Sequence, residues 1–151
     1  MFELLTDKAE TVVLHALDEA VTTNATEIEP AHMLLSIVDH GDGIAQEVLA
    51  GEGLTRQSVT GALALLEPSK RVPGEFHNRI KAGAMQYSSE SQQALQAAEE
   101  QAMELQGTRI TTDHLLLGLL ATDEVQRLLG SMNIDDKAVS RTVLEKLRDA
   151  G

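Results

Sequence analysis

The stretch IEPAHMLLSI, residues 28–37, decides the fold of this chain, because it returns 82 residues later as ITTDHLLLGL, residues 110–119. Both stretches carry the pattern Ile-x-x-x-His-x-Leu-Leu, and Ile37 is matched by Leu119. Flanking residues repeat at a spacing of 82 upstream and 80 downstream, so a two-residue deletion reconciles the copies. A repeat of this length predicts one small unit used twice and packed as a pseudo-symmetric pair.

Each copy carries the start and stop signals of four consecutive helices. The signals are capping hydroxyls and carboxylates, a first-turn proline and terminal glycines: Thr6, Pro30, Gly41, Gly51 and Thr55, then Ser88 or Ser89, Thr111, Asp123, Gly130 and Asp135. No segment shows the alternation of a strand. We therefore predict an all-α fold of two pseudo-symmetric four-helix repeats, with eight helices.

The chain is expected to form a single domain of residues 1–151. Repeat one spans 1–66, a linker 67–86, and repeat two 87–151. The linker is rich in Pro and Gly and lacks sustained periodicity, which is typical of a connection between structured units.

Composition narrows the class of protein. The chain has no cysteine, which excludes disulfides and thiol chemistry. Its start lacks the basic region and apolar run of a secretory signal, and no apolar stretch approaches the ~20 residues of a membrane span. We expect a cytoplasmic protein and a monomer, with neither cofactor nor membrane partner.

The net charge of −12 repels nucleic acid, so no nucleic-acid partner is expected. The charge is uneven, because residues 1–66 hold 11 acidic and 2 basic residues. One interpretation is a solvated acidic surface. The other is that this half prefers cationic or unfolded basic segments of a partner.

Catalytic motifs are absent from the sequence, so we predict no enzyme and no catalytic or metal-binding residue. Of the five histidines, only His32 and His114 occupy matching places, and each is predicted to bond locally at a helix start. Adjacent carboxylates such as Asp18 and Glu19 point about 100° apart on a helix, so we expect them to face solvent. Phe2 and Tyr87 are candidate partner anchors, or alternatively plugs for the seam between the repeats.

The duplicated unit, its leading Phe2, the Thr6-capped first helix and the stretch Thr112–Leu120 resemble the Clp N-terminal repeat domain, especially that of ClpC-type AAA+ unfoldases. The resemblance runs from Phe2 to about Leu147. It implies a domain that docks adaptors and substrate proteins for an ATP-driven unfoldase and its protease. The chain is expected to be either free-standing or the excised piece of such an unfoldase, and divergent.

The resemblance also implies a phosphoarginine site. The family reads Gly-Thr-Glu-His at the start of each second helix, and its Glu engages the guanidinium. Here the second repeat keeps an acid at Asp113 and a threonine at Thr112, whereas the first has Ala31 in place of the acid. The hydroxyls that open each first helix survive as Thr6 and Ser88, which completes the expected set of binding residues.

Three functions stay open at this point. The first is a binding module of the Clp system whose partners are Clp ATPase or protease subunits, adaptors and substrate proteins. The second is a free-standing accessory or decoy protein that regulates the protease or sequesters such ligands, including small-molecule ligands of Clp N-domains. The third is the sensor domain of a regulator.

Overall fold

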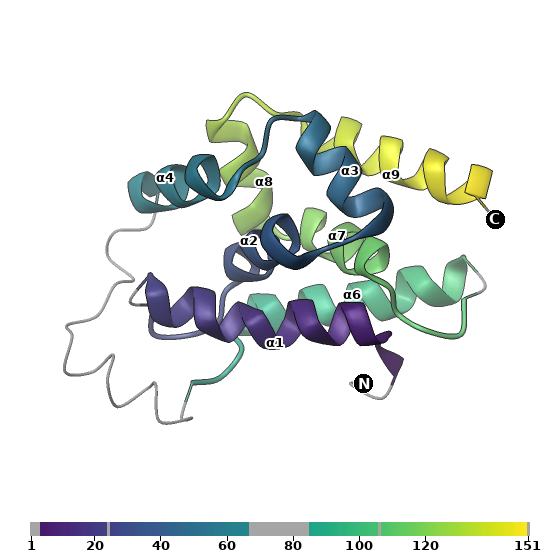
Figure 1. The fold of residues 1–151 in the computed structure, drawn as a ribbon, viewed down its shortest axis with the longest axis horizontal. Helices are drawn as coiled ribbons and strands as arrows, with labels where there is room; N and C mark the ends of the chain where they lie inside the picture. The colour runs from purple at the N-terminus through teal and green to yellow at the C-terminus, as the bar shows by residue number, and fades with distance from the viewer. Residues whose placement is uncertain (1–3, 24, 67–84, 106, 151) are drawn as a thin grey trace.

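The computed structural model describes residues 4–23, 25–66, 85–105 and 107–150, which form eight α-helices (Figure 1). Repeat one contains α1 (Asp7–Thr22), α2 (Pro30–His40), α3 (Gly43–Gly51) and α4 (Arg56–Leu66). Repeat two contains α6 (Ser89–Glu104), α7 (Thr112–Leu120), α8 (Asp123–Ser131) and α9 (Asp136–Ala150). Within these ranges there are no strands, so the predicted all-α architecture is confirmed.

The first helix of each repeat begins at the predicted cap. The hydroxyl of Thr6 accepts a hydrogen bond from the amide of Ala9 at 3.2 Å, and the hydroxyl of Ser88 accepts one from Ser91 at 3.1 Å. Each bond satisfies an amide that the first turn leaves without an intrahelical partner. Ser88, rather than Ser89, is the cap of α6.

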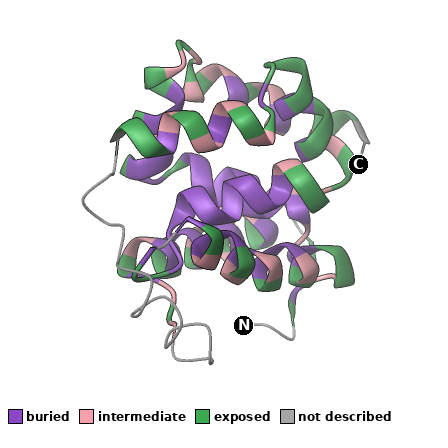
Figure 2. Cartoon of the chain, turned by 60° about the vertical axis from the view of Figure 1, so that its left-hand side comes forward, coloured by how far each residue is buried: buried purple, intermediate pink, exposed green. Residues whose placement is uncertain are grey.

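The helices lie in three layers, with α2 and α7 in the middle (Figure 1). The helices α1 and α6 cover one side of this central pair, and α3, α4, α8 and α9 cover the other. Most residues of α2 and α7 are buried, as the purple of the central helices shows (Figure 2). The stretch that repeats in the sequence therefore supplies the centre of the core.

The two repeats share this core, because α3 packs against α9 and α4 packs against α8 across the pseudo-symmetry. Within repeat two, α6 and α7 approach closely at Gly118. A Cβ atom there would lie 2.3 Å from the carbonyl oxygen of Ala94, a distance that real Cβ atoms essentially never show. The missing side chain lets the two helices approach this closely.

Two short backbone pairings hold the repeats together. Leu5 forms a parallel bridge with Ile110, and Ile28 forms one with Tyr87. The amide of Thr6 donates to the Ile110 carbonyl at 3.0 Å, and the amide of Ser88 donates to the Ile28 carbonyl at 3.0 Å. The residues that precede the first helix of each repeat are thus bonded to those that precede the second helix of the other.

The expected linker falls mostly outside the described residues, which resume at Met85. Gln86, assigned to the linker by the sequence, accepts a hydrogen bond from the amide of Ile28 at 2.9 Å through its carbonyl. Its backbone therefore takes part in the second pairing.

Candidate ligand-binding site

A pocket of about 360 Å³ lies where the starts of three helices meet. Its lining comes from the start of α1, the start of α3 and the start of α7. Thr6, Thr112 and Asp113, three residues predicted to bind ligand, all line it. Because Thr6 belongs to one repeat and Asp113 to the other, the pocket depends on the pairing of Leu5 with Ile110.

Asp113 reaches across the pocket from α7 to α3. Its Oδ1 atom accepts a hydrogen bond from the amide of Ala45 at 2.7 Å. Burial raises the pKa of the Asp113 carboxyl above its ordinary value, and the charges of Asp42 and Glu47 raise it further, whereas the bond from Ala45 lowers it. The carboxylate is thus partly desolvated and only partly satisfied, which suits it to a cationic ligand.

Thr112 is one of the residues that line the same pocket. The residue is 3% exposed, and its Oγ1 atom has no hydrogen-bond partner in the described part of the chain. Leaving a buried hydroxyl without a partner is costly, and such groups are rare in native proteins. Because Thr112 lines the pocket, a ligand that draws this hydroxyl toward the cavity would give it a partner.

Several helix-start amides beside the pocket have no hydrogen-bond partner among the described residues, and two of them matter most here. They belong to the second residue of α7, Asp113, and the second residue of α3, Ile44. No hydrogen bond within the described ranges reaches either amide. Open amides at the start of a helix attract anions, and the cation of Lys8 lines the same pocket.

The other predicted residues lie elsewhere. Ser88 is buried and caps α6, next to Ile28, so it does not join the pocket of Asp113. The hydroxyl of Tyr87 donates to the Val13 carbonyl of α1 at 2.9 Å, and burial raises its pKa. This contact favours the seam-plug interpretation of Tyr87, and its role as a partner anchor stays a prediction. Phe2 lies outside the described residues.

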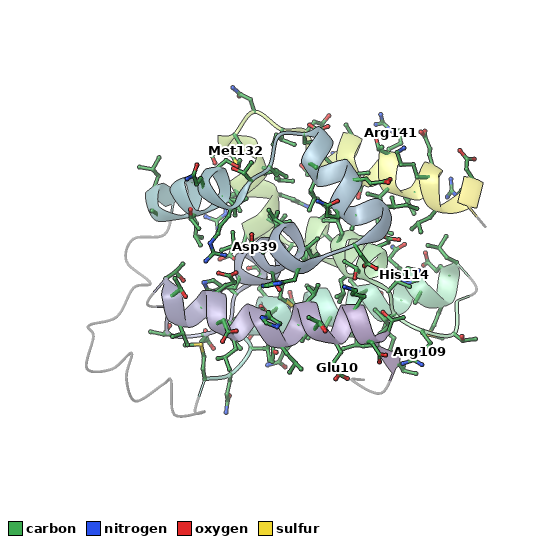
Figure 3. All side chains as sticks on the ribbon, in the orientation of Figure 1. Glu10, Asp39, Arg109, His114, Met132 and Arg141 are labelled. Carbon is green, nitrogen blue, oxygen red and sulfur yellow. The ribbon has the colours of Figure 1, made fainter. Side chains whose placement is uncertain are left out.

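His32 and His114 bond locally, as the sequence predicted. The Nδ1 atom of His32 accepts from the amide of Glu29 at 2.8 Å, and that of His114 accepts from the amide of Thr111 at 3.0 Å. Each imidazole therefore occupies the open amide at the start of its helix. Burial lowers the pKa of His114, labelled in Figure 3, which keeps the ring neutral and Nδ1 free to accept.

Acidification from pH 7.5 to 5.5 is expected to lower the free energy of unfolding through His114. Because its folded-state pKa lies below the ordinary 6.5, the unfolded chain binds the proton first, and stability falls as the pH drops through that window. One such group contributes at most about 1.4 kcal/mol per pH unit. Urea unfolding at both pH values measures the slope. His114→Gln should reduce it, and an unchanged slope in that variant would contradict the assignment.

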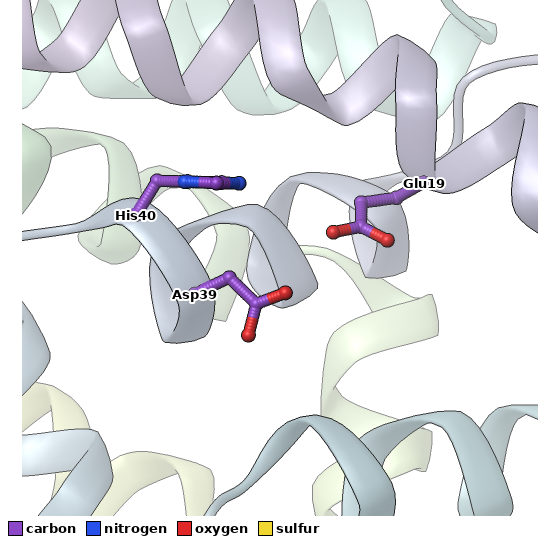
Figure 4. A group of neighbouring side chains, drawn as sticks. All are labelled: Glu19, Asp39 and His40. Atoms are coloured by element: carbon purple, nitrogen blue, oxygen red, sulfur yellow. The ribbon is translucent and has the colours of Figure 1, made fainter.

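A second polar cluster surrounds the end of α2. The carboxylates of Glu19 on α1 and Asp39 on α2 point into one space beside His40 (Figure 4), an arrangement that could hold a metal ion. Arg56 of α4 already occupies this space: it bonds both oxygens of Glu19 at 2.6 Å and also pairs with Asp39. These bonds raise the pKa of Arg56. The expectation that Glu19 faces solvent is wrong, because the residue is 4% exposed and its partner comes from another helix, whereas the adjacent Asp18 is exposed as expected.

The profile described as Clp repeat (R) N-terminal domain matches residues 4–79 and 86–150. The chain belongs to this family, as its resemblance at residues 28–37 and 110–119 predicted.

Among curated proteins, the chain is similar to the ATP-binding subunit ClpC of the ATP-dependent Clp protease. It is 28% identical to ClpC of Staphylococcus epidermidis and 29% identical to that of Staphylococcus saprophyticus, over 124 residues in each case. The match covers 82% of this chain and 14% of each relative, so the chain spans a small part of their length.

Solved structures show the same fold. The N-terminal domain of ClpD from Arabidopsis thaliana superposes with a TM-score of 0.77 at 17% identity, covering 98% of this chain and 97% of that one. The Hsp104 N-terminal domain of Candida albicans gives 0.71 at 14% identity, covering 93% and 89%. A ClpV N-domain in complex with a VipB peptide gives 0.67 at 17% identity, covering 98% and 89%.

Among the described residues, no helix combines the length and the apolar character that a membrane span requires.

Proposed function

We propose that this chain is a non-catalytic protein-binding module of the Clp unfoldase and protease system, and that it recognises phosphoarginine on substrate or adaptor proteins. The ligand site is the pocket of Thr6, Thr112 and Asp113. The ClpV N-domain, a structure of the same fold, was solved with a VipB peptide, which supports a peptide-binding role for such a domain.

The mixed polarity of the pocket carries this proposal. A phosphorylated guanidinium combines a planar set of N–H donors with an anionic phosphoryl group. Asp113 offers a carboxylate to the donors, as guanidinium recognition requires. The open amides of Asp113 and Ile44, the hydroxyl of Thr112 and the cation of Lys8 offer contacts to the phosphoryl oxygens. A ligand with only one of these charges would leave part of the pocket unsatisfied.

The pocket holds more acid than a phosphate alone would accept, since Asp7 and Asp42 also line it. A plain phosphopeptide with no positive charge near its phosphate would therefore be repelled. An unphosphorylated arginine would meet Asp113 but leave the open amides without a partner. The acidic lining disfavours a ligand that carries only a phosphate, and the open amides disfavour one that carries only a guanidinium. The pocket therefore prefers the group that combines the two.

Replacing Asp113 is expected to weaken phosphoarginine binding by roughly 10-fold to 100-fold, because a charge-assisted hydrogen bond contributes about 1.5–3 kcal/mol. Asp113→Ala removes the carboxylate. Asp113→Asn removes the charge but keeps an oxygen for the amide of Ala45, so a loss in both variants isolates the charge from the structural contact. Isothermal titration calorimetry with two peptides that differ only in phosphorylation of one arginine measures the effect.

Asp18→Ala is the matched control, because Asp18 is exposed near the opposite end of α1 from the pocket. It should bind both peptides like the parent chain. Equal affinity of the parent for the two peptides, or unchanged affinity in both Asp113 variants, would refute the proposed site.

A further inference from the structure

The pseudo-symmetry of the fold creates two related junctions between the repeats. The α3–α7 junction contains the starts of α3 and α7 and borders the pocket described above. The α2–α8 junction contains the starts of α2 and α8, which are the counterparts of α7 and α3 in the repeat. The two junctions have the same backbone plan and different side chains.

At the α2–α8 junction, the chain's own carboxylates occupy the helix starts. The Oε2 atom of Glu124 accepts a hydrogen bond from the amide of Ala31 at 2.9 Å. The Oε2 atom of Glu90 accepts one from the amide of Glu124 at 2.7 Å. Ala31 and Glu124 are the second residues of α2 and α8, and Glu124 is 3% exposed. The amides of both residues therefore already donate to carboxylates of the chain itself.

At the α3–α7 junction, neither Glu90 nor Glu124 has a carboxylate counterpart. The repeat places Ile44 where Glu124 stands and Lys8 where Glu90 stands. An isoleucine cannot accept a hydrogen bond and a lysine carries only donors, so the amides of Asp113 and Ile44 stay open. The same comparison places Pro30 opposite Thr112, which removes the pocket hydroxyl from the α2–α8 junction.

The pocket beside the α2–α8 junction differs accordingly. It measures about 370 Å³ and is lined by the first half of α6, by Gly118 and by the turn into α8. The start of α2 is not part of its lining. This helix start is the counterpart of the start of α7, which carries Thr112 and Asp113 in the other pocket. Glu90 and Asp123 line it, and the cation that Lys8 supplies to the other pocket is replaced by Glu90.

We propose that this domain binds one ligand rather than two, because Glu90 and Glu124 close the α2–α8 junction as built-in substitutes for a ligand's anion. This inference rests on the proposed function, since it assigns the phosphorylated guanidinium to the α3–α7 junction alone. An incoming phosphoryl group at the α2–α8 junction would have to displace two hydrogen-bonded carboxylates and would meet their negative charge.

The test is a titration of the ¹⁵N-labelled domain with phosphoarginine, the free amino acid, followed by amide chemical shifts. In the parent chain we expect shifts at Asp113 and Ile44 and none at Ala31 and Glu124, with calorimetry giving one site. Shifts at both junctions would overturn the single-site inference and leave the proposed function intact. Shifts at neither junction would overturn the proposed function, and the site count with it.

A variant that transfers residues from one junction to the other tests the cause. Ala31→Asp, Glu90→Lys and Glu124→Ile together copy Asp113, Lys8 and Ile44 into the α2–α8 junction. We expect a second set of shifts at residues 31 and 124 and a rise from one site to two. The control Glu90→Gln with Glu124→Gln keeps oxygen acceptors on both amides and should retain one site. A folded transfer variant without the second set would show that the carboxylates do not close the junction.

Discussion

Replacing Leu117 by alanine is expected to lower the free energy of unfolding by about 2–5 kcal/mol. Leu117 lies in α7, in the middle layer of the fold, and is 5% exposed. Truncation removes apolar contacts and leaves a cavity in a helix whose neighbours pack on all sides, so little relaxation can fill it. Domains of this size are stable by about 5–15 kcal/mol, so the loss is a large fraction of the total. Urea or thermal unfolding measures it.

Leu65→Ala is the matched control for this prediction. The same atoms are removed from α4, where Leu65 is 85% exposed, so we expect a change within about 0.5 kcal/mol. A melting temperature of Leu117→Ala within error of the parent would contradict the burial of α7. An equal loss in both variants would show that the effect does not come from burial.

Replacing Arg56 by methionine is expected to cost about 3 kcal/mol of unfolding free energy. Glu19 is 4% exposed and receives both of its bonds at 2.6 Å from Arg56, so the substitution leaves a buried carboxylate without its cation. Breaking a buried ion pair costs about 3–5 kcal/mol, and the lower end applies because Arg56 itself is 40% exposed. Chemical unfolding at neutral pH measures the loss.

A double-mutant cycle separates the pair from its surroundings. Glu19→Met combined with Arg56→Met removes both charges, so the double variant should recover much of the loss seen in Arg56→Met alone. The recovered part is the cost of leaving Glu19 unpaired. Additive losses in the two single variants would mean that the two side chains act independently and would contradict the ion-pair assignment.

The helical architecture could be predicted from the sequence because its signals are local. Thr6, Ser88 and Thr111 act as caps within three residues of their partners, so sequence spacing alone identifies them. The roles of His32 and His114 were predictable for the same reason, since each ring bonds the amide three residues before it. The 82-residue repeat then implied the pairing of the two halves.

The rest depends on contacts between residues far apart in the chain. The sequence does not indicate that Glu124 reaches Ala31, 93 residues away, or that Arg56 buries Glu19. The sequence predicts one set of binding residues from their positions in the repeat: Asp113, Thr112, Thr6 and Ser88. The pocket instead combines the start of the first helix of repeat one with the start of the second helix of repeat two. Ser88 opens the first helix of repeat two, so it lies beside the second helix of repeat one and outside this pocket.

The reciprocal bridges of Leu5 with Ile110 and Ile28 with Tyr87 have a consequence for how the chain folds. Each bridge closes a long loop, which is entropically unfavourable until the core that it borders has formed. The backbone segment before the first helix of each repeat finds its hydrogen-bond partners in the other repeat, so we expect neither half to fold on its own. We therefore expect the two repeats to unfold together, as one cooperative unit.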